Sequence, residues 1–246
     1  MRNLLVSILA SMAALWLPSA QAIAGTFSIS PVRVDLAAQS TTGVVTIRNQ
    51  EDQPVVVQAE TRLWQQTSAG EQLEATRDVL VTPAVFTIPP QGSQVVRIAL
   101  RRDADPRTEL SYRLILTEVP QQAAPGFSGL NMALRMSLPI FIAAQAPTAP
   151  QVKWSAARSP DGTVAVTALN AGSEHARVLD LMISPQPGNG EWLHQQGAYY
   201  VLPGQSHSWA LEPDKNNNDS AQWRQLRVKG STEDGDFATE LILTPE

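Results

Sequence analysis

Two arginines, Arg33 and Arg113, interrupt stretches that are otherwise apolar and β-branched. A guanidinium inside a strand must reach solvent along its stem or meet an anion, because an unpaired buried charge is costly. Asp35 lies two residues after Arg33 and therefore on the same face of an extended strand. Arg113 has no acid at that spacing, although Glu109 and Glu118 lie nearby in the sequence. Two interpretations stay open, namely internal ion pairs and the binding of an external carboxylate.

A second feature lies between residues 130 and 138, where large apolar side chains occupy every second position and small or polar ones lie between them. This alternation predicts a β-strand with one apolar face. In most strands such a face packs on the core of its own domain, and in the alternative it is offered to a partner. The residues of this face are Leu130, Met132, Leu134 and Met136.

Most enzyme and metal sites require residues that this sequence lacks. Without Cys there is no thiolate nucleophile, no sulfur-ligated zinc and no disulfide. The three His are too far apart in the sequence to form a helical metal pair. The acidic tract 214–219 begins like a calcium loop, but Asp219 stands where the turn needs Gly and Gln225 where a bidentate Glu is needed. The sequence shows no nucleophile–base pair and no phosphate loop, so we expect no enzyme, no cofactor and no metal.

Composition narrows the possible partners. The 246 residues carry a formal net charge of −5, which gives no basic surplus for a phosphate backbone, so no nucleic acid is expected. Aromatic rings could stack on sugar, which makes a secreted carbohydrate-binding protein the alternative function, although rings of this kind more often fill a small core. The four rings in question are Trp154, Trp192, Trp209 and Trp223.

The N-terminus has the pattern of an export signal. Arg2 precedes an apolar run of fourteen residues, Leu4–Leu17, and an Ala-x-Ala cleavage site follows. We expect a signal peptide over residues 1–22, with cleavage after Ala22 or Ala24. The run is shorter than the roughly 20 residues that span a bilayer, so no stable membrane insertion is expected after cleavage.

The mature chain consists of short β-branched runs separated by turn residues, without helical periodicity. Residues 25–144 contain seven such runs, as expected for an antiparallel sandwich. They are Thr26–Val34, Val44–Ile47, Val55–Leu63, Val79–Thr87, Gln94–Leu100, Leu110–Val119 and Leu130–Ile142. A short linker, 145–150, separates them from a second β-rich series, 151–246. The sequence therefore predicts an all-β protein with a seven-stranded sandwich and a second, smaller β-domain. Because Pro-rich linkers are semi-rigid, we expect the two domains to meet at an angle with a cleft between them.

Several segments resemble the PapD-like periplasmic chaperones of pilus assembly. Glu109–Pro120 resembles the family signature, in which a Glu precedes an aromatic-containing strand and a Glu-Ile-Pro sequence. The run from 88 to 98 resembles the family's proline, Gly and Val-Arg-Leu segment, and Arg33 lies sixteen residues before Asn49, as the family arginine does. The resemblance covers nearly all of the mature chain.

This resemblance implies that both domains are immunoglobulin-like β-sandwich domains. It also implies a periplasmic chaperone that folds and caps pilus subunits and delivers them to an outer-membrane usher. A subunit of that kind lacks its last strand, and the chaperone lends its own strand, here 130–138, in donor-strand complementation. In the family, an arginine at the position of Arg33 and a lysine in the last strand of the first domain hold the subunit's C-terminal carboxylate.

The sequence departs from the family pattern at two places. Pro139 stands at the lysine position, so Arg113 on the neighbouring strand becomes the candidate second anchor. Glu109 and Asp234 match members of the family's cleft salt bridge, whose arginine position is Ala143 here. Together with the absence of Cys, these departures resemble the archaic branch of the chaperone–usher systems.

Overall fold

The computed structural model describes residues 27–67, 70–120, 133–186, 192–211 and 223–245. Every regular element in these ranges is a β-strand. None of the described residues belongs to a helix long and apolar enough to cross a membrane, and none joins a metal-ligating group of three or more His, Asp or Glu side chains. The predicted signal peptide, the tract 214–219, Leu130 and Met132 lie outside the described residues.

Two sheets form the N-terminal domain. The first has the strand order β1-β3-β8-β6, and the second has the order β2-β10-β9-β4-β5, with β7 paired to β4. Every pair is antiparallel except β10 with β2, which is parallel. The strands are β1 (Phe27–Ser30), β2 (Val34–Leu36), β3 (Thr42–Asn49), β4 (Val55–Thr67), β5 (Gly70–Ala75), β6 (Val79–Thr82), β7 (Val85–Ile88), β8 (Ser93–Leu100), β9 (Leu110–Val119) and β10 (Arg135–Ile142).

The core of this domain follows from the alternation of each strand. Alternate side chains of a strand point to opposite faces, so the apolar set of each sheet turns toward the other sheet. The first sheet contributes Val45, Ile47, Val96 and Ile98, and the second contributes Tyr112, Leu114, Leu116 and Ile140, all fully buried.

The region predicted as one strand, Thr26–Val34, is divided between the two sheets. β1 ends at Ser30, residues 31–33 form a bend, and β2 begins at Val34. Pro31 has no N–H to donate, so it cannot extend the ladder between β1 and β3. Arg33 therefore lies in a bend, whereas the sequence had placed it inside a strand.

The strand expected around residues 79–87 is also divided, since β6 pairs with β8 in the first sheet and β7 with β4 in the second. β5 was not predicted at all.

The strands of the C-terminal domain form one continuous hydrogen-bonded series in the order β14-β13-β16-β17-β11-β12-β15. It encloses a second core that contains Trp209 and Trp223, each 5% exposed, while Trp154 and Trp192 pack against that core. Two of the four rings thus lie in the core and the other two pack on it, as is usual for aromatic residues of a small sandwich. The strands are β11 (Val152–Arg158), β12 (Val164–Asn170), β13 (Ala176–Gln186), β14 (Leu193–Val201), β15 (Ser206–Leu211), β16 (Gln225–Thr232) and β17 (Gly235–Pro245).

Both domains use a buried asparagine at the end of a strand to hold a neighbouring turn. Asn49 closes β3, donating Nδ2 to the carbonyls of Gln53 and Pro89 at 2.8 and 3.2 Å, and its Oδ1 accepts the N–H of Glu51 at 2.9 Å. Asn170 closes β12, donating Nδ2 to two carbonyls and accepting two backbone N–H groups on Oδ1. Both side chains satisfy backbone groups that would otherwise be buried without partners.

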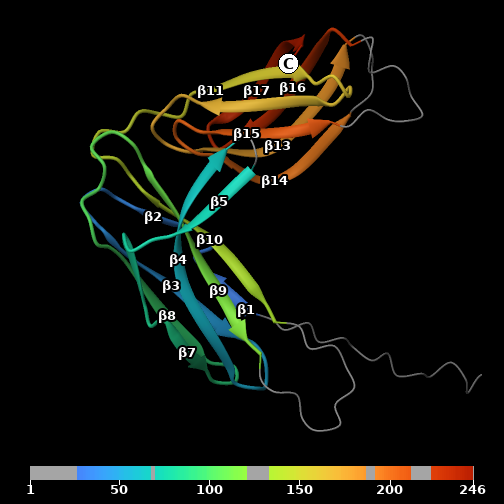
Figure 1. Cartoon of the computed structure of the whole chain (residues 1–246). Coiled ribbons are helices and arrows are strands. Elements are labelled where there is room, and N and C mark those ends of the chain that lie inside the picture. The colour runs from blue at the N-terminus through green and yellow to red at the C-terminus, as the bar shows by residue number, and fades with distance from the viewer. Residues whose placement is uncertain (1–26, 68–69, 121–132, 187–191, 212–222, 246) are drawn as a thin grey trace, which may run out of the picture.

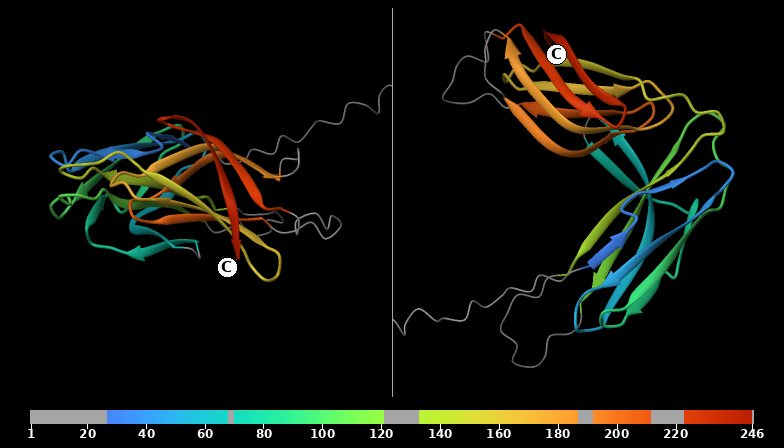
Figure 2. Two further views of the ribbon diagram at one scale, coloured as in Figure 1. Left: turned by 90° about the horizontal axis from the view of Figure 1, so that it is seen from above. Right: turned by 180° about the vertical axis from the view of Figure 1, so that it is seen from behind.

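The two domains meet at an angle and open on one side, as Figures 1 and 2 show. The far end of β4 reaches the C-terminal domain, where Gln66 donates to the carbonyl of Tyr200 at 2.7 Å and accepts the N–H of Leu202 at 2.9 Å. A small apolar cluster of Trp64, Phe141, Tyr200 and Leu202 lies beside these bonds. Packing and hydrogen bonds between the domains therefore help to fix the angle between them.

Candidate functional site

One edge of β10 is free along Arg135–Pro139. β9 pairs with β10 from Arg135 to Ile142, whereas β2 covers the other side only along Ile140–Ile142. Among the described residues, no strand covers the side of Arg135–Pro139 that faces away from β9. An uncovered edge of this kind is a template for a strand from another chain.

Hydrogen bonds near the two ends of β10 show which of its backbone groups point to the free edge. On the β9 side, the N–H of Glu118 donates to the carbonyl of Leu134 at 2.8 Å, and on the β2 side the N–H of Ala143 donates to the carbonyl of Leu36 at 2.8 Å. Backbone direction alternates along a strand, so odd-numbered residues of β10 face away from β9. Positions 135 and 137 thus present an N–H and a C=O each, and the proline at 139 presents a carbonyl alone.

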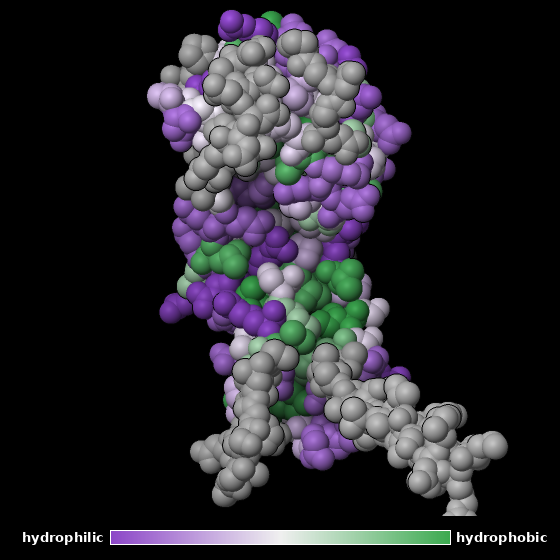
Figure 3. Space-filling view, turned by 90° about the vertical axis from the view of Figure 1, so that its right-hand side faces the viewer, coloured by the Kyte–Doolittle hydropathy of each residue, from purple (hydrophilic) through white to green (hydrophobic). Residues whose placement is uncertain are grey.

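The apolar face of β10 passes from the core to the surface. Leu138 is 5% exposed and belongs to the core, Met136 is partly buried against it, and Leu134 is 39% exposed. The alternation inferred from the sequence is therefore present at the described positions. Figure 3, which looks into the opening between the domains, shows hydrophobic surface on the N-terminal domain below a band of hydrophilic surface.

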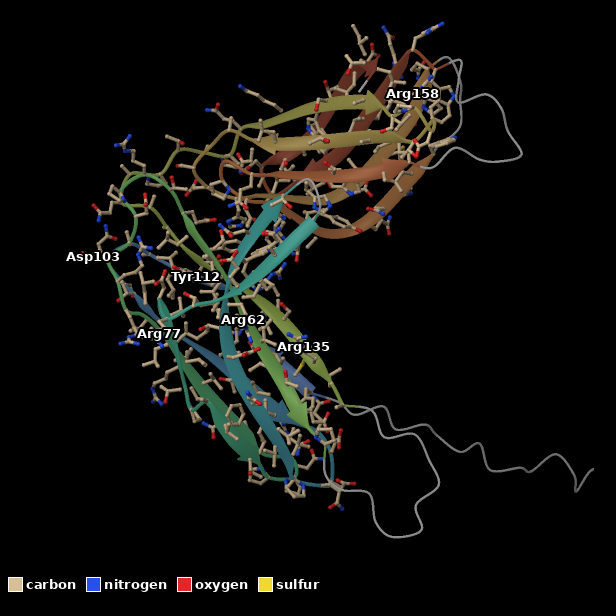
Figure 4. The ribbon with its side chains drawn as sticks, viewed as in Figure 1. Arg62, Arg77, Asp103, Tyr112, Arg135 and Arg158 are labelled. Carbon is tan, nitrogen blue, oxygen red and sulfur yellow. The ribbon has the colours of Figure 1, made fainter. Side chains whose placement is uncertain are left out.

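Three arginines follow one line across the cleft side of the second sheet. Pro139 of β10 pairs with Arg113 of β9, and Arg113 pairs with Arg62 of β4. Arg33 precedes β2, whose first residue pairs one position after Pro139. In Figure 4, Arg62 lies at the middle of the N-terminal sheet and Arg135 at the start of β10. Pro139, which stands at the position of the family's lysine, thus lies between Arg113 on β9 and Arg33 just before β2.

Arg33 holds two carboxylates with different nitrogens. Its Nε donates to Asp35 at 2.8 Å, and its Nη1 donates to the two oxygens of Glu233 at 2.9 and 3.1 Å. The internal pairing with Asp35 that the sequence suggested is present, and the second partner comes from the C-terminal domain. Desolvation opposes the charge, but the ion pairs with Asp35 and Glu233 raise the pKa of Arg33 above its ordinary value.

Glu233 lies in the turn between β16 and β17 and meets a second guanidinium, that of Arg177 on β13. Arg177 Nη1 donates to Glu233 Oε1 at 2.6 Å. Burial on its own would raise the pKa of Glu233, but the hydrogen bonds from Arg177 and Arg33 outweigh it and lower that pKa. The resemblance indicated Asp234 as the acid of the cleft salt bridge in this turn. In the structure, its neighbour Glu233 is the acid that pairs with Arg33.

Arg113 is enclosed more tightly than Arg33. Its guanidinium carbon lies 3.5 Å from the centroid of the Trp64 ring, and Nη2 donates to Glu71 of β5 at 3.4 Å. Only 13% of the side chain is exposed, and desolvation lowers the pKa of Arg113 against the opposing effect of Glu71. The two acids considered from the sequence, Glu109 and Glu118, are not its partners in the structure, because Glu71 comes from a strand that was not predicted.

Glu109 instead joins the domains through a histidine. Its two carboxylate oxygens lie 2.9 Å from Nδ1 of His175, whose ring stacks on Phe141 with centroids 3.7 Å apart. Burial raises the pKa of Glu109, although the hydrogen bond from His175 opposes the rise. Sequence reasoning missed His175, Arg177 and Glu233, because their partners lie far away along the chain.

Comparison with known proteins places this geometry in a family. Residues 26–147 match the family model described as pili and flagellar-assembly chaperone, PapD N-terminal domain. No curated protein sequence gave a significant match to the chain.

Solved structures of chaperones share the fold. A chain in the CsuC–CsuE chaperone–tip adhesion subunit complex, from the archaic chaperone–usher Csu pili of Acinetobacter baumannii, superposes with a TM-score of 0.65 at 20% identity, covering 90% of this chain and 99% of that one. The Salmonella enterica SafA pilin–SafB chaperone complex gives 0.60 at 14% identity, covering 89% and 97%, and the E. coli chaperone DraB gives 0.57 at 17%, covering 87% and 98%. With the family match over its N-terminal domain and the shared two-domain fold, the chain belongs to the PapD-like family of pilus-assembly chaperones.

Proposed function

We propose that this chaperone acts in the periplasm, caps pilus subunits by donor-strand complementation along β10 and the residues before it, and delivers them to an outer-membrane usher. The observation that carries the proposal is the free edge of Arg135–Pro139, which ends beside Arg33. Backbone pairing and an anchoring charge thus occur at one place.

The geometry of the edge favours one orientation for the incoming strand. β2 lies on the same side of β10 as the free edge and covers Ile140–Ile142, so an added strand must stop short of β2, next to Arg33. A strand that runs parallel to β10 places its carboxyl end there, and an antiparallel strand places its amino end there. A cation attracts the carboxylate and repels the ammonium group, so the parallel orientation is favoured.

Apolar side chains would supply most of the binding energy. The proposed donor residues share one face of the strand, and each large apolar side chain that becomes fully buried contributes about 1.5–3 kcal/mol before association costs. Arg33 would fix the register by holding the subunit's C-terminal carboxylate, with Arg113 as a second cation of the same sheet. The donor residues are Leu130, Met132, Leu134 and Met136.

Two observations support the finer assignment to the archaic branch. One of the similar structures is a complex of a chaperone with a tip adhesion subunit from an archaic chaperone–usher system. The present chain also lacks Cys and carries Pro139 in place of the family lysine. The predicted signal peptide over residues 1–22 supports a periplasmic location, where an usher in the outer membrane would be the next partner.

A pair of neighbouring substitutions tests the donor strand. Leu134→Gln places an amide on the apolar face, and Arg135→Gln, the matched control, places the same side chain on the opposite face. The chaperone variants are co-expressed in the periplasm with an affinity-tagged pilus subunit from the same genome, and the co-purified chaperone is quantified. We expect recovery to fall at least tenfold for Leu134→Gln and to stay near wild type for Arg135→Gln. Equal recovery of both variants would contradict the donor assignment.

A further inference from the structure

A carboxylate already occupies the cleft. Glu233 Oε1 accepts hydrogen bonds from Arg33 Nη1 at 2.9 Å and from Arg177 Nη1 at 2.6 Å. The two guanidinium groups belong to different domains, and both converge on one oxygen atom. This arrangement shows that the cleft can hold a carboxylate between two arginines.

From this geometry we infer that Arg33 and Arg177 together form the clamp for the subunit's C-terminal carboxylate, and that Glu233 occupies the clamp until a subunit replaces it. The inference rests on the proposed function and extends it, because it adds a cation from the C-terminal domain and an internal competitor. A side-chain carboxylate and a peptide C-terminus present the same planar pair of oxygens, so each satisfies the same donors.

Arg33 binds its two carboxylates with different nitrogen atoms, which makes the exchange possible. Asp35 accepts from Nε, whereas Glu233 accepts from Nη1, so the guanidinium keeps its orientation when Glu233 leaves. The charge balance is also preserved. Two arginines face Asp35 and Glu233 in the free protein, and they would face Asp35 and the subunit carboxylate in the complex.

Glu233 is placed where it can leave at small cost. It lies in the exposed turn before Gly235, whose φ of +130° is typical of glycine, and 39% of its side chain is exposed. Arg177 has a further contact, since its guanidinium carbon lies 5.8 Å from the centroid of the Tyr200 ring. Release of Glu233 leaves both cations in place and removes one direct contact between the domains.

An internal competitor lowers the apparent affinity for the external carboxylate by the fraction of time that it fills the site. For a partly exposed network of this kind, we expect its removal to strengthen binding about fivefold. The affinity of the free chaperone for subunits would thus be set partly by Glu233.

The test measures binding of a minimal C-terminus, N-acetylglycine, to the full mature chain by NMR of the arginine Nε–H resonances. N-acetylglycinamide, which has no carboxylate, is the ligand control. Glu233→Gln should bind N-acetylglycine about fivefold more tightly than wild type. Glu240→Gln, which removes another exposed acid that pairs with an arginine, Arg227, should bind as wild type does. Arg177→Gln should weaken binding about tenfold, and thermal unfolding verifies that each variant is folded.

Each variant tests a different part of the inference. Unchanged or weaker binding by Glu233→Gln would overturn the role of Glu233 as competitor, and unchanged binding by Arg177→Gln would overturn the clamp, while the anchor on Arg33 would stand in both cases. Arg33→Gln separates this inference from the proposed function, because unchanged binding by that variant would remove the carboxylate anchor itself. Equal binding of N-acetylglycine and its amide would likewise contradict recognition of a carboxylate.

Discussion

Arg113 offers a direct way to distinguish an anchoring role from a structural one. Its guanidinium lies against Trp64 and reaches Glu71, so a substitution affects stability whatever it does to binding. Arg113→Ala removes the charge and the stem together. Arg113→Met removes the charge and keeps an apolar stem of similar length over Trp64.

The expected loss of stability follows from the contacts of Arg113. A desolvated cation–π contact contributes about 2 kcal/mol, and an ion pair with a partner as exposed as Glu71 adds less than about 1 kcal/mol. Arg113→Ala should therefore lower the free energy of unfolding by about 2–3 kcal/mol. For a domain of this size, that corresponds to a decrease in Tm of about 10 °C, measured by circular dichroism. Arg113→Met should lose about half as much, because its stem still covers Trp64.

Binding is then measured at low temperature, where both variants remain folded. If Arg113 is the second cation for the subunit carboxylate, both variants should capture subunits at least tenfold more weakly, since a hydrogen bond to a charged group contributes about 1.5–3 kcal/mol. Wild-type capture by Arg113→Met with a lowered Tm would refute the anchoring role. An unchanged Tm for Arg113→Ala would refute the packing argument.

Two further predictions concern Glu109, which contacts the C-terminal domain, and Asn49, which holds a turn. Burial raises the pKa of Glu109, so the folded protein holds a proton on Glu109 at pH values where the unfolded chain has lost it; the stabilising contribution is complete below the ordinary value of 4.5 and is lost as pH rises through the folded pKa. Urea unfolding across this range should show that wild type loses more stability with rising pH than Glu109→Gln, and parallel curves would contradict the assignment. Asn49→Ala should lower the free energy of unfolding by about 2–4 kcal/mol, because it leaves several buried backbone groups without partners, whereas a loss below about 1 kcal/mol in calorimetry would show that water replaces the amide.

Local features of this protein can be predicted from its amino-acid sequence. Short β-branched runs between turn residues identify strands such as β9 and β10, and alternation with a period of two identifies the apolar face at the start of β10. The ion pair between Arg33 and Asp35 could be predicted as one of two open interpretations, because it depends on residues within one segment.

Features that depend on segments far apart in the sequence became visible only in the folded protein. β5 escaped prediction because its sequence, GEQLEA, is polar and mostly exposed at the edge of a sheet, where pairing with β4 and not burial holds it. The division of the first strand depends on which sheet each half can join. Glu233 meets Arg33 across 200 residues, and His175 meets Glu109 across 66. No local pattern encodes such pairs, because they exist only where the packing of two domains brings their side chains within hydrogen-bond distance.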